Sequence, residues 1–287
     1  MASEPTAATP SGESTNRGLR VVVAWLVLSA IATPLVAIYV GPLIPPGNGS
    51  VQAQGQTFSN QVMTAFVTPI ICLLAVFFAY GLIQFHARRN EAILDGPPLR
   101  NDSRIQLLWI VITTTMVLFL AGFGTYQLLQ NGSGGGQGPS PIAVPSGSKL
   151  PVQVIAQQWQ FTYRYPTYGG VETPRLVLPA DTDVELHVTS LDAIHSFWAY
   201  ELGVKADANP GVDNVAFVET RGPQTFHVRC AELCGLFHGY MFNNGKVVPQ
   251  SQFTAWIKSQ QSDFAAVAKY LPKYSKTYYP DPQRRAG

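Results

Sequence analysis

The sequence predicts a membrane-anchored all-β protein, with apolar helices at the N-terminal side and a small β-sandwich or Greek-key barrel after them. Two observations predict this fold class. The apolar residues of the first half concentrate in three uncharged blocks, at about residues 21–44, 62–85 and 105–129. Each block is long enough for a bilayer, which needs about 20 residues of helix. Beyond residue 148 the apolar period becomes two, as in Val152 and Val154 or Val184 and Leu186, which is typical of half-buried strands.

The chain before the first block is polar, and we expect residues 1–20 to form a disordered N-terminal tail. Arg17 and Arg20 then precede the apolar run, an order of charge and apolarity that signal peptides share, and Ala30-Ile-Ala32 could serve as a cleavage site. The run is longer than the roughly 7–15 apolar residues of a signal peptide. This favours a retained first helix over a cleaved one.

Positive charge sets the expected orientation. The loop between the second and third blocks carries more arginines than acidic residues, namely Arg88, Arg89, Arg100 and Arg104. Loops of this kind stay in the cytoplasm, and Arg17 and Arg20 place the N-terminus on the same side. We therefore expect a multi-pass protein of the bacterial inner membrane, with the C-terminal domain on the periplasmic side.

The remaining chain divides by composition into a flexible linker at residues 131–147, a β domain at 148–260 and a helical or irregular tail at 261–287. Apolar residues at helical spacing, including Phe253 and Trp256, predict a helix over 251–271 that packs on the barrel or extends past it. His187 and His227 fall on the outward phase of their strands and His86 lies among arginines, so all three are expected to be solvated.

The overall charge of +2 favours no nucleic-acid partner, and three cysteines are too few for a disulfide framework. Cys72 lies in an apolar block and is expected to be an inert small hydrophobe. Residues 150–260 carry ten acidic and seven basic side chains. That slight excess could steer a basic partner by long-range attraction.

The chemistry concentrates in Cys230-Ala-Glu-Leu-Cys234-Gly-Leu-Phe-His238-Gly-Tyr-Met241, with a further imidazole upstream at His195. Thiolate and thioether are soft ligands and imidazole suits copper, so this set favours copper over a hard cation. Two other readings use the same residues. The two cysteines and two histidines could form a tetrahedral zinc site, or Cys230 and Cys234 could form a disulfide.

The Cys230–Met241 segment resembles the binuclear copper (CuA) loop of the cytochrome c oxidase subunit II family. The segments at 195–211 and 158–165 resemble that family's first-histidine and aromatic segments, and the likeness covers roughly residues 60–260. The resemblance implies a cupredoxin-like Greek-key barrel behind two transmembrane helices, to which this chain adds an extra first helix. The spacing of Met241, the position of Glu232 and the extracytoplasmic location then weigh against zinc.

The resemblance also implies roles for individual residues. Cys230 and Cys234 would bridge two copper ions, with His195 on one copper and His238 on the other. Met241 and the backbone carbonyl of Glu232 would be the weak ligands. The Glu232 carboxylate would face a magnesium ion shared with oxidase subunit I. Trp159 would be the site where electrons enter, although its strand pattern alone is equally consistent with a core tryptophan.

The function implied by the resemblance is that of subunit II of a haem–copper terminal oxidase. Such a subunit accepts electrons from cytochrome c or a similar periplasmic carrier and passes them to haem in subunit I, where oxygen is reduced to water. Its partners would be subunits I and III, the electron carrier and membrane lipid. One departure concerns proton uptake, since Gln106 stands where the family usually has a glutamate. The alternative is a membrane-anchored copper-binding or copper-delivery protein.

Overall fold

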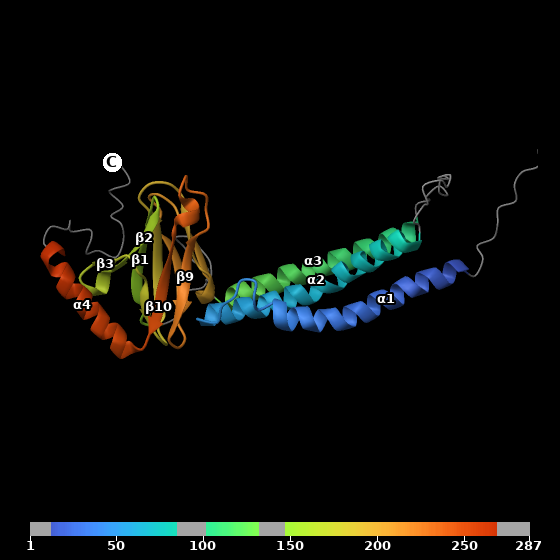
Figure 1. The fold of residues 1–287 in the computed structure, drawn as a ribbon, viewed down its shortest axis with the longest axis horizontal. Coiled ribbons are helices and arrows are strands. Elements are labelled where there is room, and N and C mark those ends of the chain that lie inside the picture. The colour runs from blue at the N-terminus through green and yellow to red at the C-terminus, as the bar shows by residue number, and fades with distance from the viewer. Residues whose placement is uncertain (1–12, 85–101, 132–146, 269–287) are drawn as a thin grey trace, which may run out of the picture. The chain divides into compact units, whose positions relative to one another are not determined.

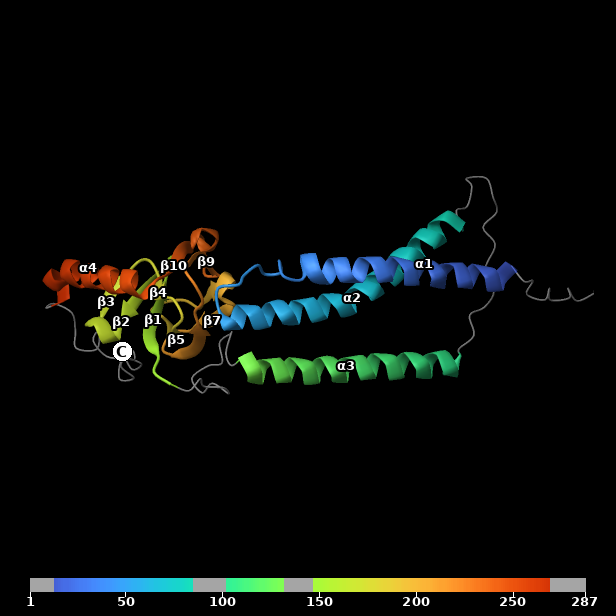
Figure 2. The same ribbon diagram turned by 90° about the horizontal axis from the view of Figure 1, so that it is seen from below.

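A computed structural model describes residues 13–84, 102–131 and 147–268 of the chain (Figures 1 and 2). The first residues of the expected tail, the arginine-rich loop, most of the expected linker and the end of the C-terminal tail lie outside the described residues. The chain forms two compact units. The helical unit comprises Met1–Pro42 and Asn60–Thr114, and the β unit comprises Leu43–Ser59 and Thr115–Gly287.

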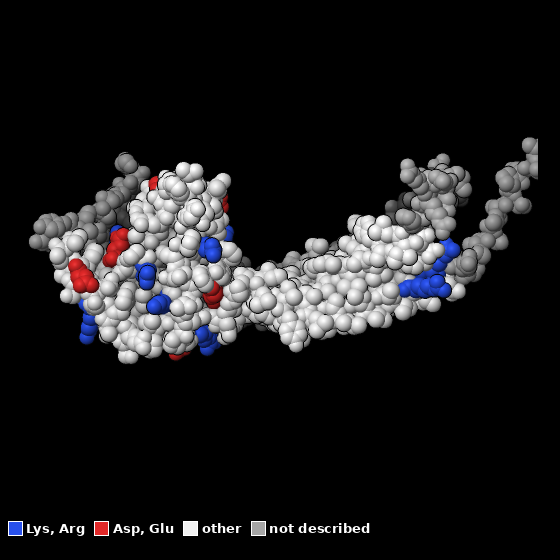
Figure 3. All heavy atoms as spheres, viewed as in Figure 1, with Lys and Arg blue, Asp and Glu red and all other residues white. Residues whose placement is uncertain are grey.

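Three long apolar helices occupy the N-terminal part of the described chain: α1 (Glu13–Leu35), α2 (Val51–Gln84) and α3 (Ser103–Asn131). All three are long and apolar enough to cross a membrane. A π-helical turn over Val36–Val40 extends α1. Figure 3 shows a nearly uncharged helical surface, with the arginines gathered at the end where α1 and α3 begin. These features fit the predicted transmembrane helices.

Two helices begin earlier than the hydropathy pattern indicates. α1 already includes Glu13, although residues 1–20 were expected to be a disordered tail. α2 begins at Val51 and not near residue 62. The reason lies partly in capping, because the Ser50 hydroxyl accepts a hydrogen bond from the Ala53 backbone N–H at 2.9 Å. This bond satisfies one of the free N–H groups of the first turn and allows the polar residues before the apolar block to be helical.

The β unit holds two five-stranded sheets, one in the order β3-β2-β1-β5-β8 and the other in the order β4-β10-β9-β6-β7. The first sheet consists of β1 (Leu150–Gln157), β2 (Gln160–Tyr165), β3 (Val171–Thr173), β5 (Asp183–Ser190) and β8 (Asn214–Glu219). The second consists of β4 (Val177–Pro179), β6 (His195–Ala199), β7 (Val204–Ala208), β9 (Gln224–Cys230) and β10 (Phe242–Val248).

The sheets mix parallel and antiparallel pairs. β1 runs parallel to β5 and β10 runs parallel to β4, while the other pairs are antiparallel. Alternate side chains of both sheets meet in one core, in which Val154, Leu186, Phe197 and Phe226 are fully buried. This is the cupredoxin-like β-sandwich expected from the sequence, and the predicted fold class is confirmed.

The last described helix, α4 (Gln250–Ala268), packs against the sandwich. Phe253 is buried and lies against the rings of Tyr165 and Tyr168, with centroids 6.3 and 5.7 Å away. Trp256 adds an edge contact to Tyr165 at 5.5 Å. The apolar face seen in the sequence therefore covers the sandwich near β2 and does not extend away from it.

The prediction that His187 is solvated was wrong. Its side chain is only 1% exposed, although it lies on the outward phase of β5. The Nδ1 atom lies 2.8 Å from Asp213 Oδ2, and Nε2 lies 3.2 Å from Glu185 Oε1. Burial of a polar ring is tolerated because both nitrogens face carboxylates. His227, by contrast, is exposed as expected and contacts Glu201.

Asn243, Asn244 and Gly245 are residue types common in turns, but here all three belong to the strand β10. Asn243 is held at two points, accepting a hydrogen bond from the Tyr163 hydroxyl and donating one to the Pro174 carbonyl. Gly245 lies directly over the Phe226 ring, where a Cβ would be 2.1 Å from Cζ and 2.9 Å from the Leu176 carbonyl oxygen. The glycine thus serves close packing in a strand and not chain reversal.

Gly245→Ala is expected to lower the free energy of unfolding by about 1–3 kcal/mol, since the added methyl group overpacks a core that cannot yield. Phe226 is fully buried and the other contact is backbone. Thermal unfolding of the soluble β domain measures the effect. Gly222→Ala is the matched control, because nothing lies within 4 Å of the Cβ it would add. Equal melting temperatures for the two variants would contradict this account of Gly245.

Candidate metal centre

The pairing of β6 with β9 brings the two halves of the site together. Phe197 on β6 lies opposite Cys230, the last residue of β9, and the Ala231 N–H donates to the Ser196 carbonyl at 2.9 Å. This register places His195, the first residue of β6, beside Cys230. The loop after β9 then returns to β10, where the Cys230 N–H donates to the Met241 carbonyl at 3.0 Å. The site is therefore formed by the end of β9, the loop between β9 and β10, and the first residue of β6.

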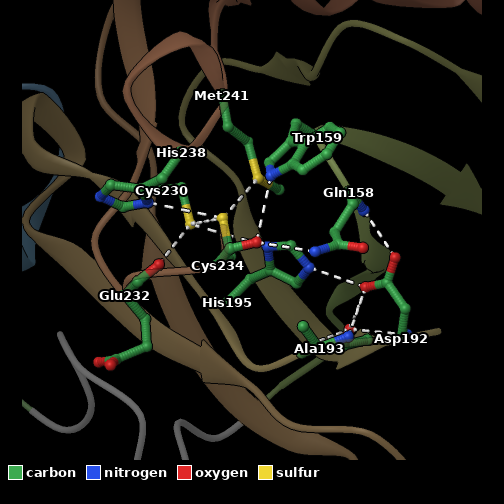
Figure 4. A network of polar contacts seen from close by, with 11 residues as sticks. Gln158, Trp159, Asp192, Ala193, His195, Cys230, Glu232, Cys234, His238 and Met241 are labelled. Carbon is green, nitrogen blue, oxygen red and sulfur yellow. Dashed lines mark hydrogen bonds and ion pairs between the residues drawn. The ribbon is translucent and has the colours of Figure 1, made fainter. Parts of the chain in front are cut away.

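Five side chains from these segments converge (Figure 4). The two sulfurs, Cys230 Sγ and Cys234 Sγ, lie 3.8 Å apart. His195 Nδ1 is 3.8 Å from Cys230 Sγ, and His238 Nδ1 is 3.5 Å from Cys234 Sγ. Met241 Sδ is 3.8 Å from Cys234 Sγ. The arrangement has two thiols at its centre, with an imidazole beside each of them.

The Glu232 backbone supplies a sixth donor, since its carbonyl oxygen lies 3.2 Å from Cys230 Sγ. Its side chain is exposed, and Figure 4 shows the carboxylate directed away from the sulfurs. His195 is fully buried and Met241 nearly so, whereas His238 is only partly covered. The structure thus brings together every predicted ligand, with both weak donors on the same loop as the cysteines.

Burial, with a contribution from the adjacent Cys230 thiol, raises the pKa of the Cys234 thiol to about 12. The metal-free protein therefore holds this sulfur as a thiol near neutral pH. A metal ion that binds here must displace that proton, as thiolate sites generally require.

Trp159 lies against the same loop. Its indole Nε1–H donates to the Cys234 carbonyl at 3.1 Å, and its ring meets Phe237 edge-on with centroids 4.8 Å apart. The tryptophan is partly exposed and packs against the margin of the core, so it is not the fully buried tryptophan that the strand pattern equally allowed. A direct hydrogen bond connects it to a residue of the sulfur pair.

Gly235 allows this close approach. It has a φ of +110°, a region that L-residues rarely adopt, and a Cβ at this position would lie 3.2 Å from Gln158 Nε2. Gln158 uses that amide to donate a second hydrogen bond to the Cys234 carbonyl, at 2.9 Å. The glycine of the motif thus lets the aromatic segment dock on the loop.

Asp192, which carried no predicted role, lies behind His195. Its Oδ1 lies 2.9 Å from His195 Nε2, and its other oxygen accepts the Gln158 N–H at 2.7 Å. Partial burial tends to raise the pKa of Asp192, but the hydrogen bonds from Gln158, His195 and Ala193 outweigh it and lower the pKa. A carboxylate on the outer nitrogen orients the ring and directs Nδ1 at the sulfurs. An aspartate three residues before a candidate ligand is the signal that could have revealed it.

The donor set fits copper. Two thiols, two imidazoles and a thioether are soft or borderline ligands, and the buried Met241 sulfur is a donor that a zinc site does not use. Among the described residues, His195, Cys230 and Cys234 form the group of His, Cys, Asp and Glu side chains close enough to hold one metal ion. The free state of both cysteines also leaves their sulfurs available as ligands.

Three apolar helices and a cupredoxin-like domain define a class of membrane-anchored proteins, and the donor set of this domain suits a soft metal ion. Comparisons with known proteins narrow this class further. Residues 171–248 match the family model for the periplasmic domain of cytochrome c oxidase subunit II. Cytochrome c oxidase subunit 2 of Synechocystis sp. is 26% identical over 259 residues, which are 77% of each chain. The subunit 2 of Thermostichus vulcanus is 25% identical and covers 86% of this chain and 88% of its own.

A eukaryotic relative, cytochrome c oxidase subunit 2 of Podospora anserina, is 29% identical over 66% of this chain and 83% of its own. Among solved structures, the periplasmic domain of subunit II of cytochrome oxidase from Bradyrhizobium japonicum is similar, with 27% identity and a TM-score of 0.41 over 42% of this chain and 99% of that one. The chain is thus similar to the cytochrome c oxidase subunit II proteins over most of its length, and its residues 171–248 match the model of their periplasmic domain. It is therefore anchored in a membrane, with its C-terminal domain outside the cytoplasm.

Proposed function

We propose that this chain is the electron-accepting subunit II of a haem–copper terminal oxidase in a bacterial inner membrane. It takes electrons from cytochrome c or a similar periplasmic carrier at a binuclear copper (CuA) centre. It passes them to haem in subunit I, where oxygen is reduced to water. Subunit III is a further expected partner. The observation that carries the proposal is the convergence of His195, Cys230, Cys234, His238 and Met241 at one buried point.

The chain's own residues hold that centre in a fixed geometry. Cys230 and Cys234 would offer their two thiolates, His195 and His238 one imidazole each, and Met241 and the Glu232 carbonyl the weaker donors. A copper pair bound this way supplies a one-electron redox centre that suits both Cu(I) and Cu(II). Asp192 orients His195, while Gln158 and Trp159 fix the Cys234 carbonyl. Because the donors are already placed, little rearrangement is needed.

Trp159 is proposed as the residue at which electrons enter. The position of Trp159 supports this role, since the ring is partly exposed and its N–H donates a hydrogen bond to the carbonyl of Cys234. The Glu232 carboxylate is proposed as an oxygen ligand of a magnesium ion at the contact with subunit I. Its exposure and its direction away from the sulfurs support that role, because carboxylate oxygen suits Mg²⁺.

The second candidate function is that of a membrane-anchored copper-delivery protein, which the same ligands could serve. A delivery protein must release its metal, and this is favoured by few and accessible ligands. Here three of the donor side chains are buried to at least 95%: His195, Cys234 and Met241. Their burial favours a fixed redox centre over a delivery site.

The deciding experiment counts copper in the soluble part of the chain after residue 146, reconstituted with the metal. We expect a pair of copper ions per chain, with an EPR hyperfine pattern of one unpaired electron shared equally by two copper nuclei. A single copper that a chelator removes easily would favour the delivery protein. The same metal analysis on the intact complex tests the magnesium site, because Glu232→Gln should remove one magnesium ion and leave the copper unchanged.

A further inference from the structure

The helix α1 carries an apolar groove along its surface. The groove has a volume of about 620 Å³, which lies within the roughly 300–1,000 Å³ of small-molecule binding clefts. Leu19, Val27 and Ile31 are 61%, 55% and 58% exposed, so the described part of the chain leaves the groove uncovered. Its lining consists of one arginine, Arg20, and six apolar residues: Leu19, Val23, Ala24, Val27, Leu28 and Ile31.

The groove lies on a different face of α1 from the one that packs on α2. Trp25 donates its indole N–H to the Pro69 carbonyl of α2 at 2.8 Å. Ser29, one turn further along α1, is only 9% exposed. Neither Trp25 nor Ser29 lines the groove. α2 therefore holds α1 on one side and leaves the groove open on another.

The groove is about as long as one leaflet of a bilayer is thick. With a helical rise of about 1.5 Å per residue, Arg20 and Ile31 lie about 16 Å apart along the axis. The apolar core of a bilayer is about 30 Å thick, so one leaflet accounts for about 15 Å. The C-terminal domain is outside the cytoplasm, and three crossings therefore place the start of α1 on the cytoplasmic side. Arg20 thus lies at the cytoplasmic surface of the membrane, and the groove runs from there toward the middle.

Positive charge is concentrated at the cytoplasmic end of the groove. Arg17 lies one turn before Arg20, and Figure 3 shows basic side chains gathered at this end of the helices. Arg20 is exposed and is the charged residue among those that line the groove. A guanidinium stays charged near neutral pH and can form paired hydrogen bonds with phosphate oxygens. This end of the groove therefore suits an anionic head group.

We propose that the groove is a binding site for an anionic phospholipid of the cytoplasmic leaflet, with an acyl chain along the apolar side chains and the phosphate on Arg20. The extent of the groove favours a lipid over a helix of another subunit. A transmembrane helix crosses both leaflets, whereas the groove ends at Ile31 and the span of α1 continues to Val40. The inference does not depend on the copper site, because it uses only residues of the helical unit.

The first test uses the full-length chain in vesicles of phosphatidylcholine, with spin-labelled phosphatidylglycerol and spin-labelled phosphatidylcholine of the same acyl chains as probes. EPR spectra distinguish lipid held by the protein from free lipid. The unmodified chain should hold phosphatidylglycerol about fivefold more strongly, as expected for one basic residue at a membrane surface. Arg20→Gln should remove this preference, while Arg104→Gln, which changes an exposed arginine at the start of α3, should keep it. Equal binding of the two lipids by the unmodified chain, or equal effects of the two substitutions, would overturn the proposed site.

The second test fills the groove without changing charge. Ala24→Phe places a ring in the groove and should remove one bound phosphatidylglycerol from each chain. Leu26→Phe is the matched control, because Leu26 is 53% exposed on α1 and does not line the groove. Unchanged lipid binding in the Ala24→Phe variant would refute the proposal. Loss of a polypeptide that otherwise copurifies with the chain from native membranes would also refute it, since the groove would then hold a protein helix.

Discussion

Cys234→Ala is expected to abolish the binding of two copper ions as a pair. Turnover with reduced cytochrome should fall by more than about 10³-fold, equivalent to roughly 4 kcal/mol. The reason is geometric. Cys234 Sγ lies near Cys230, His238 and Met241, so its removal takes away the donor that connects the others. The measurement is turnover of the purified complex, with copper content and the EPR signal recorded on the same sample.

The chain offers a matched control in Cys72→Ala. Cys72 is also a buried free cysteine, but it lies in α2 far along the chain from the site. Its replacement removes one small apolar group and should leave copper content and turnover within about twofold of the unmodified complex. If the Cys234 variant assembled and turned over normally, the proposed relay would be wrong.

The second large effect is expected for Trp159→Phe. The change keeps an aromatic ring but removes the N–H donor to the Cys234 carbonyl. We expect electron transfer from cytochrome to fall about 10²-fold, or roughly 2.7 kcal/mol, with the copper content unchanged. Rapid mixing of reduced cytochrome with the oxidised complex measures the rate directly.

Trp256→Phe serves as the control for this prediction. Trp256 is also a partly buried tryptophan in an aromatic cluster, but it packs on Tyr165 and Phe253, away from the copper loop. Its variant should show a small loss of stability and an unaltered rate. Equal rates in the two variants would mean that Trp159 only packs against the loop.

Much of the fold was readable from the sequence, because membrane helices and half-buried strands each impose a period or a length on apolar residues. The three spans, the period of two after residue 148 and the amphipathic face of α4 all follow from that rule. The period of two gave a wrong prediction of exposure where a residue is buried by contacts from elsewhere in the chain. His187 lies on the outward phase of its strand, yet Asp213 from the loop before β8 contacts it in the folded chain. No local pattern could indicate that contact.

Most of the candidate ligands could also be predicted from the sequence, because four of these side chains lie within twelve residues of the chain. A single loop is enough to bring those four together. His195 and Asp192 differ, because they reach the site only through the pairing of β6 with β9. The sequence by itself determined the kinds of donor present and the apolar lengths that anchor the chain, as both are set by residue type and spacing. Only the tertiary structure decided that a carboxylate lies behind His195 and that the indole of Trp159 donates to the Cys234 carbonyl. These depend on strand register and loop packing, which bring together residues distant in the chain.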